Sequence, residues 1–90
     1  MKEVVHKIFH KDEGHAWLEV QKSELVNLGI ADKISAFSYE RGTKAYLEED
    51  IDAYQYIWAM ESKGYKVNFQ LAMLDTINKS IIRTYSPYIK

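Results

Sequence analysis

Short segments rich in β-branched and aromatic residues alternate with segments of helical period along this chain. Residues 3–9 and 15–20 predict the two strands of a hairpin, because a polar turn closed by Gly14 lies between them. In the second strand Trp17 and Glu19 share one face, and the alternate positions, which are all apolar, share the other. The chain therefore opens with a hairpin that is expected to bury one face.

A short helix and a second hairpin are expected next. Ser23 predicts the N-cap of this helix, since a hydroxyl accepts from free backbone N–H groups, and Gly29 predicts its end. Residues 36–40 and 44–49 predict the hairpin, with Gly42 supplying a positive φ in its turn.

The clearest helical period runs from Asp50, the expected N-cap, to Lys63, and Gly64 ends it. One face of this helix carries Ile51, Tyr54, Ile57, Trp58 and Glu61. Trp58 is expected in the core or at its edge, because a small domain needs large aromatic side chains to fill its interior. Strict alternation over residues 65–71 then predicts a half-buried strand.

Two interpretations of the tail stay open. Residues 74–85 have apolar positions at helical spacing, which favours a helix, but their last six residues also suit a strand. Hairpins with interposed helices predict one α+β domain over residues 1–90. We expect an antiparallel sheet of about five strands in the order ββαββαβ, with helices on one face and a C-terminal helix or extended tail.

Composition and charge exclude several classes of protein. The 90 residues include 12 Lys and Arg against 13 Asp and Glu, a net charge of −1, which weighs against both a basic nucleic-acid binder and a strongly acidic DNA mimic. The absence of cysteine excludes disulfides, thiolate metal sites and a cysteine nucleophile. No apolar run approaches the roughly 18 residues that span a bilayer, and no secretory leader is visible, so a soluble cytoplasmic protein is expected.

Histidines cluster near the first turn. His6, His10 and His15 lie close to Asp12 and Glu13 in the sequence. His6 and His10 would be about 13 Å apart on one strand face, so only His10 and His15 can approach one another across the turn. A solvated polar loop is the favoured interpretation, and a metal-assisted hydrolase stays an alternative. Neither a metal nor a cofactor is predicted.

The second hairpin and the acidic residues that follow it are the main candidates for contact with a partner. Arginine offers donors in a planar fork, and tyrosine offers rigid amphipathic area. Acidic residues before a helix are also favoured by the helix dipole alone. The predicted partner-binding residues are Tyr39, Glu40, Arg41, Lys44, Glu48, Glu49 and Asp52.

Basic and aromatic residues interleave near the C-terminus, an arrangement that can stack on and pair with single-stranded nucleic acid. The residues of this alternative site are Lys79, Arg83, Tyr85 and Tyr88. The other interpretation of the tail tyrosines is that they pack the C-terminus onto the domain. No P-loop, GxGxxG, HExxH or GxSxG motif is present, so no enzyme is predicted.

Several strings of residues together carry a resemblance. They are GHAWLEV at residues 14–20, LGIADKIS at 28–35, SYERG at 38–42, AYLEED at 45–50 and RTYSPY at 83–88. In order and spacing they resemble a family of small proteins without an assigned function, carried by bacteriophages, plasmids and other bacterial mobile elements. The chain departs from that family at Ala16, Gln21 and Ile51, where Gly, Pro and Cys are usual.

The resemblance implies a setting but no reaction and no catalytic residues. Very small proteins of mobile elements often bind and block a host protein, including restriction or CRISPR machinery. We therefore expect a non-catalytic module that binds a host protein or complex. A homodimer and a nucleic-acid-associated regulator stay open, and no membrane partner is expected.

Overall fold

The computed structural model describes residues 3–11, 14–73 and 85–89. Their elements are β1 (Glu3–Lys11), β2 (Ala16–Gln21), α1 (Lys22–Asn27), the 3-10 turn η1 (Ala31–Lys33), β3 (Tyr39–Arg41), β4 (Lys44–Glu48), α2 (Asp52–Ser62), β5 (Tyr65–Met73) and β6 (Ser86–Pro87). The predicted α+β class is confirmed. The tail helix or strand expected over 74–85 lies outside the described residues, apart from its last position. No helix in these ranges is long and apolar enough to cross a membrane.

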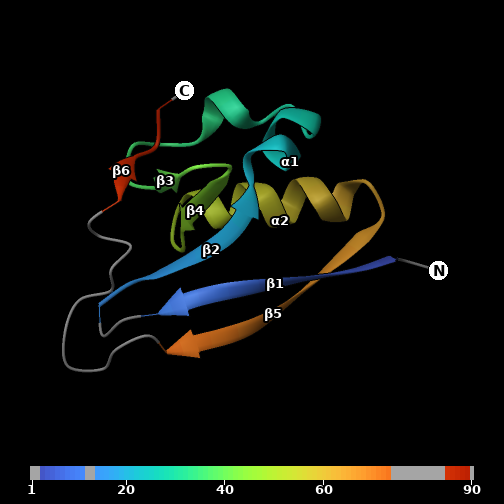
Figure 1. Ribbon diagram of the computed structural model, residues 1–90. Helices are drawn as coiled ribbons and strands as arrows, with labels where there is room; N and C mark the ends of the chain where they lie inside the picture. Colours follow the sequence, from blue (N-terminus) through green and yellow to red (C-terminus); the bar gives the residue numbers. More distant parts are fainter. Residues whose placement is uncertain (1–2, 12–13, 74–84, 90) are drawn as a thin grey trace.

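The six strands form one sheet in the order β5-β1-β2-β4-β3-β6 (Figure 1). Four of the neighbouring pairs are antiparallel, but β5 runs parallel to β1. The predicted order ββαββαβ and a sheet of about five strands are confirmed, with the short β6 as a sixth strand, but the expectation that all strands are antiparallel is wrong. The parallel pair results from α2, which carries the chain from β4 back across the sheet, so that β5 runs beside β1 in the same direction.

The predicted alternation in β2 is confirmed and separates two clusters of side chains. Ala16, Leu18 and Val20 pack against residues of α1 and α2, while Trp17 belongs to a second cluster on the opposite face. The centre of the main core is fully buried and consists of Leu18, Leu25, Ile34, Ala45, Leu47 and Tyr56. The helices therefore cover one face of the sheet, as the sequence predicts, and the cluster with Trp17 lies on the other face.

Both predicted helix caps are wrong. α1 begins before Ser23, because β2 runs directly into it, and the backbone N–H of Gln21 donates to Glu24 Oε2 at 2.8 Å. The N-cap position of α2 is Ile51, and Asp50 lies in the preceding turn. Acidic side chains do fix the start of each helix, but neither is the residue that the sequence pattern favours.

The predicted glycine positions are confirmed. Gly42 has a φ of 60° in the turn between β3 and β4, and Gly64 has a φ of 92° where the chain leaves α2. Gly29 likewise follows the end of α1. Only glycine enters this region of φ without a steric cost, so the turns stand where the sequence places them.

Candidate protein-binding surfaces

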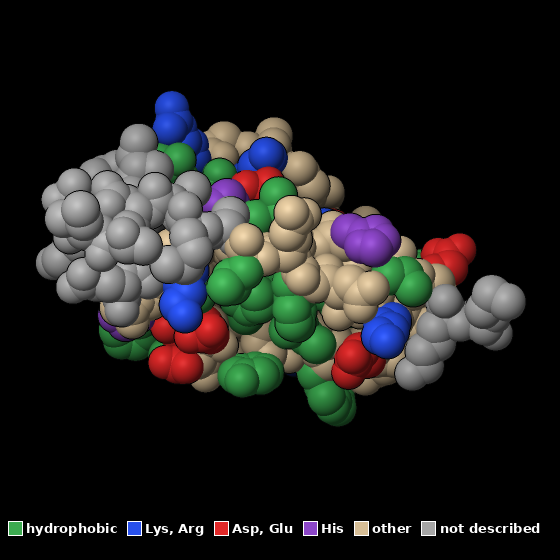
Figure 2. Space-filling model, turned by 90° about the horizontal axis from the view of Figure 1, so that it is seen from below, with side chains coloured by type: hydrophobic (Ala, Val, Ile, Leu, Met, Phe, Trp, Pro, Cys, Tyr) green, Lys and Arg blue, Asp and Glu red, His purple; other side chains and the backbone are tan. Residues whose placement is uncertain are grey.

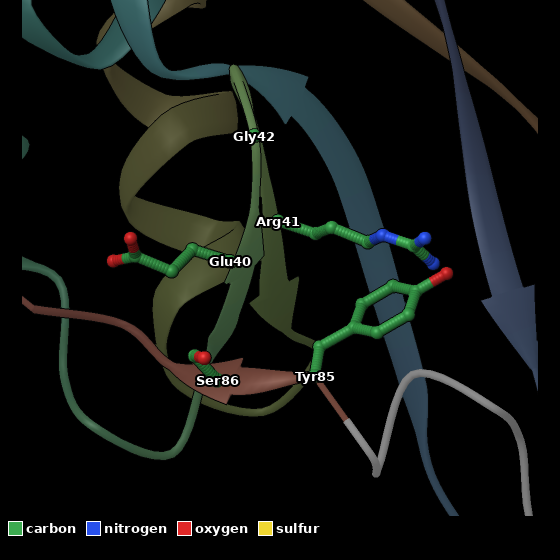
Figure 3. Close-up of a pocket in the computed structure, with 5 residues that line it drawn as sticks. All are labelled: Glu40, Arg41, Gly42, Tyr85 and Ser86. Atoms are coloured by element: carbon green, nitrogen blue, oxygen red, sulfur yellow. The ribbon is translucent and has the colours of Figure 1, made fainter.

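A shallow pocket lies beside the turn between β3 and β4. Because β6 pairs with β3, the chain brings Tyr85 and Ser86 next to Arg41, although more than forty positions separate them in the sequence. The pocket, of about 410 Å³, is lined by Glu40, Arg41, Gly42, Tyr85 and Ser86 (Figure 3). We call these five residues the hairpin pocket.

The hairpin pocket presents a cation. The guanidinium carbon of Arg41 lies 5.1 Å from the centre of the Tyr85 ring, and the side chain extends toward the hydroxyl end of that ring (Figure 3). Within the described ranges no carboxylate forms an ion pair with Arg41. Glu40 points away and accepts from Lys22 Nζ at 2.8 Å and from the backbone N–H of Ile89 at 2.7 Å. These bonds lower the pKa of Glu40, so it remains an anion that is already paired.

Aromatic rings pack together behind the hairpin pocket, on the face of the sheet opposite the helices. The rings of Trp17 and Tyr39 are 6.0 Å apart, and those of Tyr46 and Tyr85 are 5.2 Å apart. Trp17 and Tyr46 are buried in this cluster, and burial raises the pKa of Tyr46. The cluster holds Tyr85 in place beneath Arg41, so the pocket is built on a packed layer.

A carboxylate on the same face, that of Glu19, has two side-chain partners. Glu19 Oε1 lies 2.8 Å from His10 Nε2, and Glu19 Oε2 accepts from Lys44 Nζ at 3.1 Å. Burial alone would raise the pKa of Glu19, but the bonds from His10 and Lys44 outweigh burial and lower it. Lys44, a predicted contact residue, is thus already paired within the molecule.

Of the acidic residues predicted to contact a partner, some lie on the surface and others are buried. Glu49 is exposed, but Glu48 and Asp52 are buried. Asp52 Oδ2 accepts three hydrogen bonds, from the N–H of Ser35 at 3.0 Å and from the hydroxyls of Ser35 and Ser38 at 2.7 and 2.5 Å. Asp52 therefore ties the turn at residues 35–38 to the start of α2 and offers no carboxylate to a partner.

Two residues of the alternative nucleic-acid site, Tyr85 and Tyr88, lie in the part of the chain that the structure describes. Lys79 and Arg83 lie outside the described residues. Tyr88 is buried, its hydroxyl donates to the carbonyl oxygen of Ala31 at 2.7 Å, and burial raises its pKa. Tyr85 is half-buried in the hairpin pocket.

His10 and His15 of the first hairpin each lie beside a different glutamate. His10 belongs to β1 and contacts Glu19, whereas His15 Nδ1 lies 3.5 Å from Glu48 Oε1. Asp12 lies outside the described residues, as does Glu13. In the described part of the chain, no three His, Asp or Glu side chains form a group that could hold a metal ion.

The outer side of α2 carries a surface that the sequence analysis missed. Trp58 is 74% exposed and Tyr54 is 63% exposed, and Ile51 is exposed beside the start of the helix. The expectation that Trp58 lies in the core is wrong, because Tyr56 and Met60 on the opposite side of α2 fill it. We call Ile51, Tyr54 and Trp58 the helix face. The sequence does contain a signal for this surface, because α2 carries apolar residues on two sides and a domain of this size buries only one side of such a helix.

A groove of about 310 Å³ adjoins the helix face, between α2 and the segment from α1 to η1. The residues that line it include Leu28, Ile30, Lys33, Trp58, Ala59 and Lys63. Lys33 marks one end, because its carbonyl oxygen accepts from Gln55 at 3.0 Å, and Lys63 follows the other end of α2. Eight helical positions separate Gln55 from Lys63, which is about 12 Å along the axis. We call this the helix groove.

The two lysines leave the helix groove positively charged at its ends. Both are exposed, and among the described side chains neither forms an ion pair. The lining between them is mainly apolar, with Leu28, Ile30, Trp58 and Ala59 beside the polar Gln55 and Ser62. Such a groove accommodates an apolar side chain whose neighbours are anionic.

Comparisons with known proteins return no match: no family model, no curated protein and no solved structure matches this chain. The function is therefore argued from the surfaces described above. Of the groups that these surfaces present, the exposed Trp58, Tyr54 and Arg41 are of the residue types enriched at protein–protein interfaces.

Proposed function

We propose that this chain is a small non-catalytic protein-binding module of a bacterial mobile element, acting in the cytoplasm as an inhibitor of a host defence complex of the CRISPR or restriction type. The observation that carries the binding role is the helix face, above all Trp58 at 74% exposure beside Tyr54. Tryptophan and tyrosine are enriched among the residues that dominate binding energy, and contiguous exposed apolar surface marks interaction sites. The setting comes from the resemblance described above.

The charge of the helix groove specifies the chemistry of the partner. Lys33 and Lys63 stand at its two ends, and a mainly apolar lining lies between them. A partner segment with apolar side chains flanked by carboxylates matches both features, because opposite charges steer association and aliphatic contact stabilises the bound state. Trp58 belongs to the helix face and also lines the groove, so it is expected to be the central contact.

The test is affinity capture of the tagged protein from a nuclease-treated bacterial lysate, with Trp58→Ala and a matched control in parallel. Val26→Ala is the control, because Val26 is also an exposed apolar side chain but lies on α1. We expect one host protein in near-stoichiometric amount with the wild type and with Val26→Ala, and little with Trp58→Ala. The purified host protein should then lose activity when the wild-type chain is added.

Two results would contradict the proposal. Equal capture by Trp58→Ala and the wild type would show that the helix face is not the contact surface. A host protein that is recovered only when nuclease is omitted would instead support the nucleic-acid alternative.

A further inference from the structure

The strand β5 forms one end of the sheet, and only β1 pairs with it among the described strands. It is nine residues long and contains no proline, and Lys66 is its only charged residue. Sheet edges in monomeric proteins are usually protected by short length, proline, bulges or several charges. A long and nearly uncharged edge such as this one is suited to pairing with another strand.

Apolar side chains beside this edge are also uncovered. Phe69 and Leu71 share the face of β5 that contains the buried Val67, yet they are 49% and 57% exposed. Figure 2 views the molecule from the side of β1 and β5 and shows hydrophobic side chains gathered across the middle of this surface. The ring of Phe69 packs edge-on against that of Phe9, with 5.0 Å between centres.

We propose that β5 pairs with β5 of a second copy of this chain, antiparallel and with the two-fold axis at Phe69, so that two sheets become one. Phe69 is the middle residue of Tyr65–Met73, so only this register pairs all nine residues of both strands. An antiparallel ladder of this length contains about eight to ten hydrogen bonds.

The sequence of β5 is self-complementary in this register. Val67 stands opposite Leu71 of the second copy, and Phe69 stands opposite itself, so apolar positions meet on one face. On the other face Asn68 stands opposite Gln70. Lys66 stands opposite position 72, which is alanine, so no like charges face each other across the ladder. The occupant that best fits this edge is therefore a second copy of the same strand.

The test is the mass of the full chain in solution, measured by sedimentation over a wide range of concentrations. Two double variants change only the exposed positions that face each other in the proposed register. Asn68→Lys with Gln70→Lys places lysine opposite lysine at both pairs, whereas Asn68→Glu with Gln70→Lys places opposite charges there. Circular dichroism confirms that each variant is folded.

We expect the wild type to pass from one chain to two as concentration rises. The variant with two lysines should dimerise roughly tenfold more weakly, and the variant with opposite charges at least as tightly as the wild type. A wild type that stays monomeric throughout, or variants that dimerise equally, would overturn the proposal. Trp58→Ala should leave dimerisation unchanged, so this result and the capture result are independent.

Discussion

Replacing the buried carboxylate of Asp52 is expected to destabilise the whole domain. The side chain is 0% exposed, and its Oδ2 is the acceptor for three hydrogen bonds from Ser35 and Ser38. It also stands in the first turn of α2, where the helix dipole favours a negative charge. Asp52→Ala removes the acceptor and leaves the buried hydroxyl of Ser38 without it.

The expected cost follows from these bonds. Each hydrogen bond to a charged group contributes about 1.5–3 kcal/mol, and bonds that share one acceptor atom do not add fully. Removing the carboxylate also relieves the cost of keeping a charge out of water. We therefore expect Asp52→Ala to lower the free energy of unfolding by about 3 kcal/mol, which is about 12–24 °C in melting temperature for a domain of this size.

The measurement is urea unfolding followed by circular dichroism, with Asp50→Ala as the matched control. Asp50 is an exposed aspartate two positions earlier, so its replacement should change the free energy of unfolding by less than about 0.5 kcal/mol. Ser38→Ala combined with Asp52→Ala should cost less than the sum of the single changes, because the two residues share a bond. A loss below about 1 kcal/mol for Asp52→Ala, or an equal loss for Asp50→Ala, would refute this reasoning.

Three further predictions concern other contacts. Glu24 accepts hydrogen bonds from Lys7 at 2.7 Å and from Tyr56 at 2.9 Å. Burial alone would raise the pKa of Glu24, but these bonds, together with one from the backbone N–H of Gln21, lower the pKa below 4.5. The resulting stability is present above the unfolded pKa and is lost as pH falls through the lower folded value. Urea titrations in a pH series should therefore show that Glu24→Gln lowers the free energy of unfolding by about 1–2 kcal/mol at neutral pH. The stability of this variant should also fall less than that of the wild type as the pH is lowered, and an unchanged dependence on acid would count against this account. Trp58→Ala should change the free energy of unfolding by less than about 0.5 kcal/mol in the same assay, and a larger loss would mean that the ring is packed. Arg41→Glu should weaken capture of the partner without moving the melting temperature, and full capture would exclude the hairpin pocket as a contact.

The local spacing of hydrophobic residues predicts most helices and strands of this fold, but it does not predict which strands pair with one another. The strand over 65–71 and the helix up to Lys63 follow from spacing alone, because each period belongs to a single element. The pairing of β5 with β1 joins residues about sixty positions apart, and no local pattern specifies it. The hairpin pocket depends on the same kind of distant contact, since Tyr85 reaches Arg41 only through β6.

The position of the helix face has a local cause that the hydrophobic pattern conceals. α2 has two apolar sides, and the side with Tyr54 and Trp58 is at least as apolar in sequence as the side with Tyr56 and Met60. Asp52 decides between them, because its bonds to the turn at 35–38 hold it inside the domain. Tyr56 and Met60 follow at intervals of four, so they share the side of Asp52 and enter the core. Trp58 then points outward, so the carboxylate that holds the start of α2 also accounts for the exposure of the helix face.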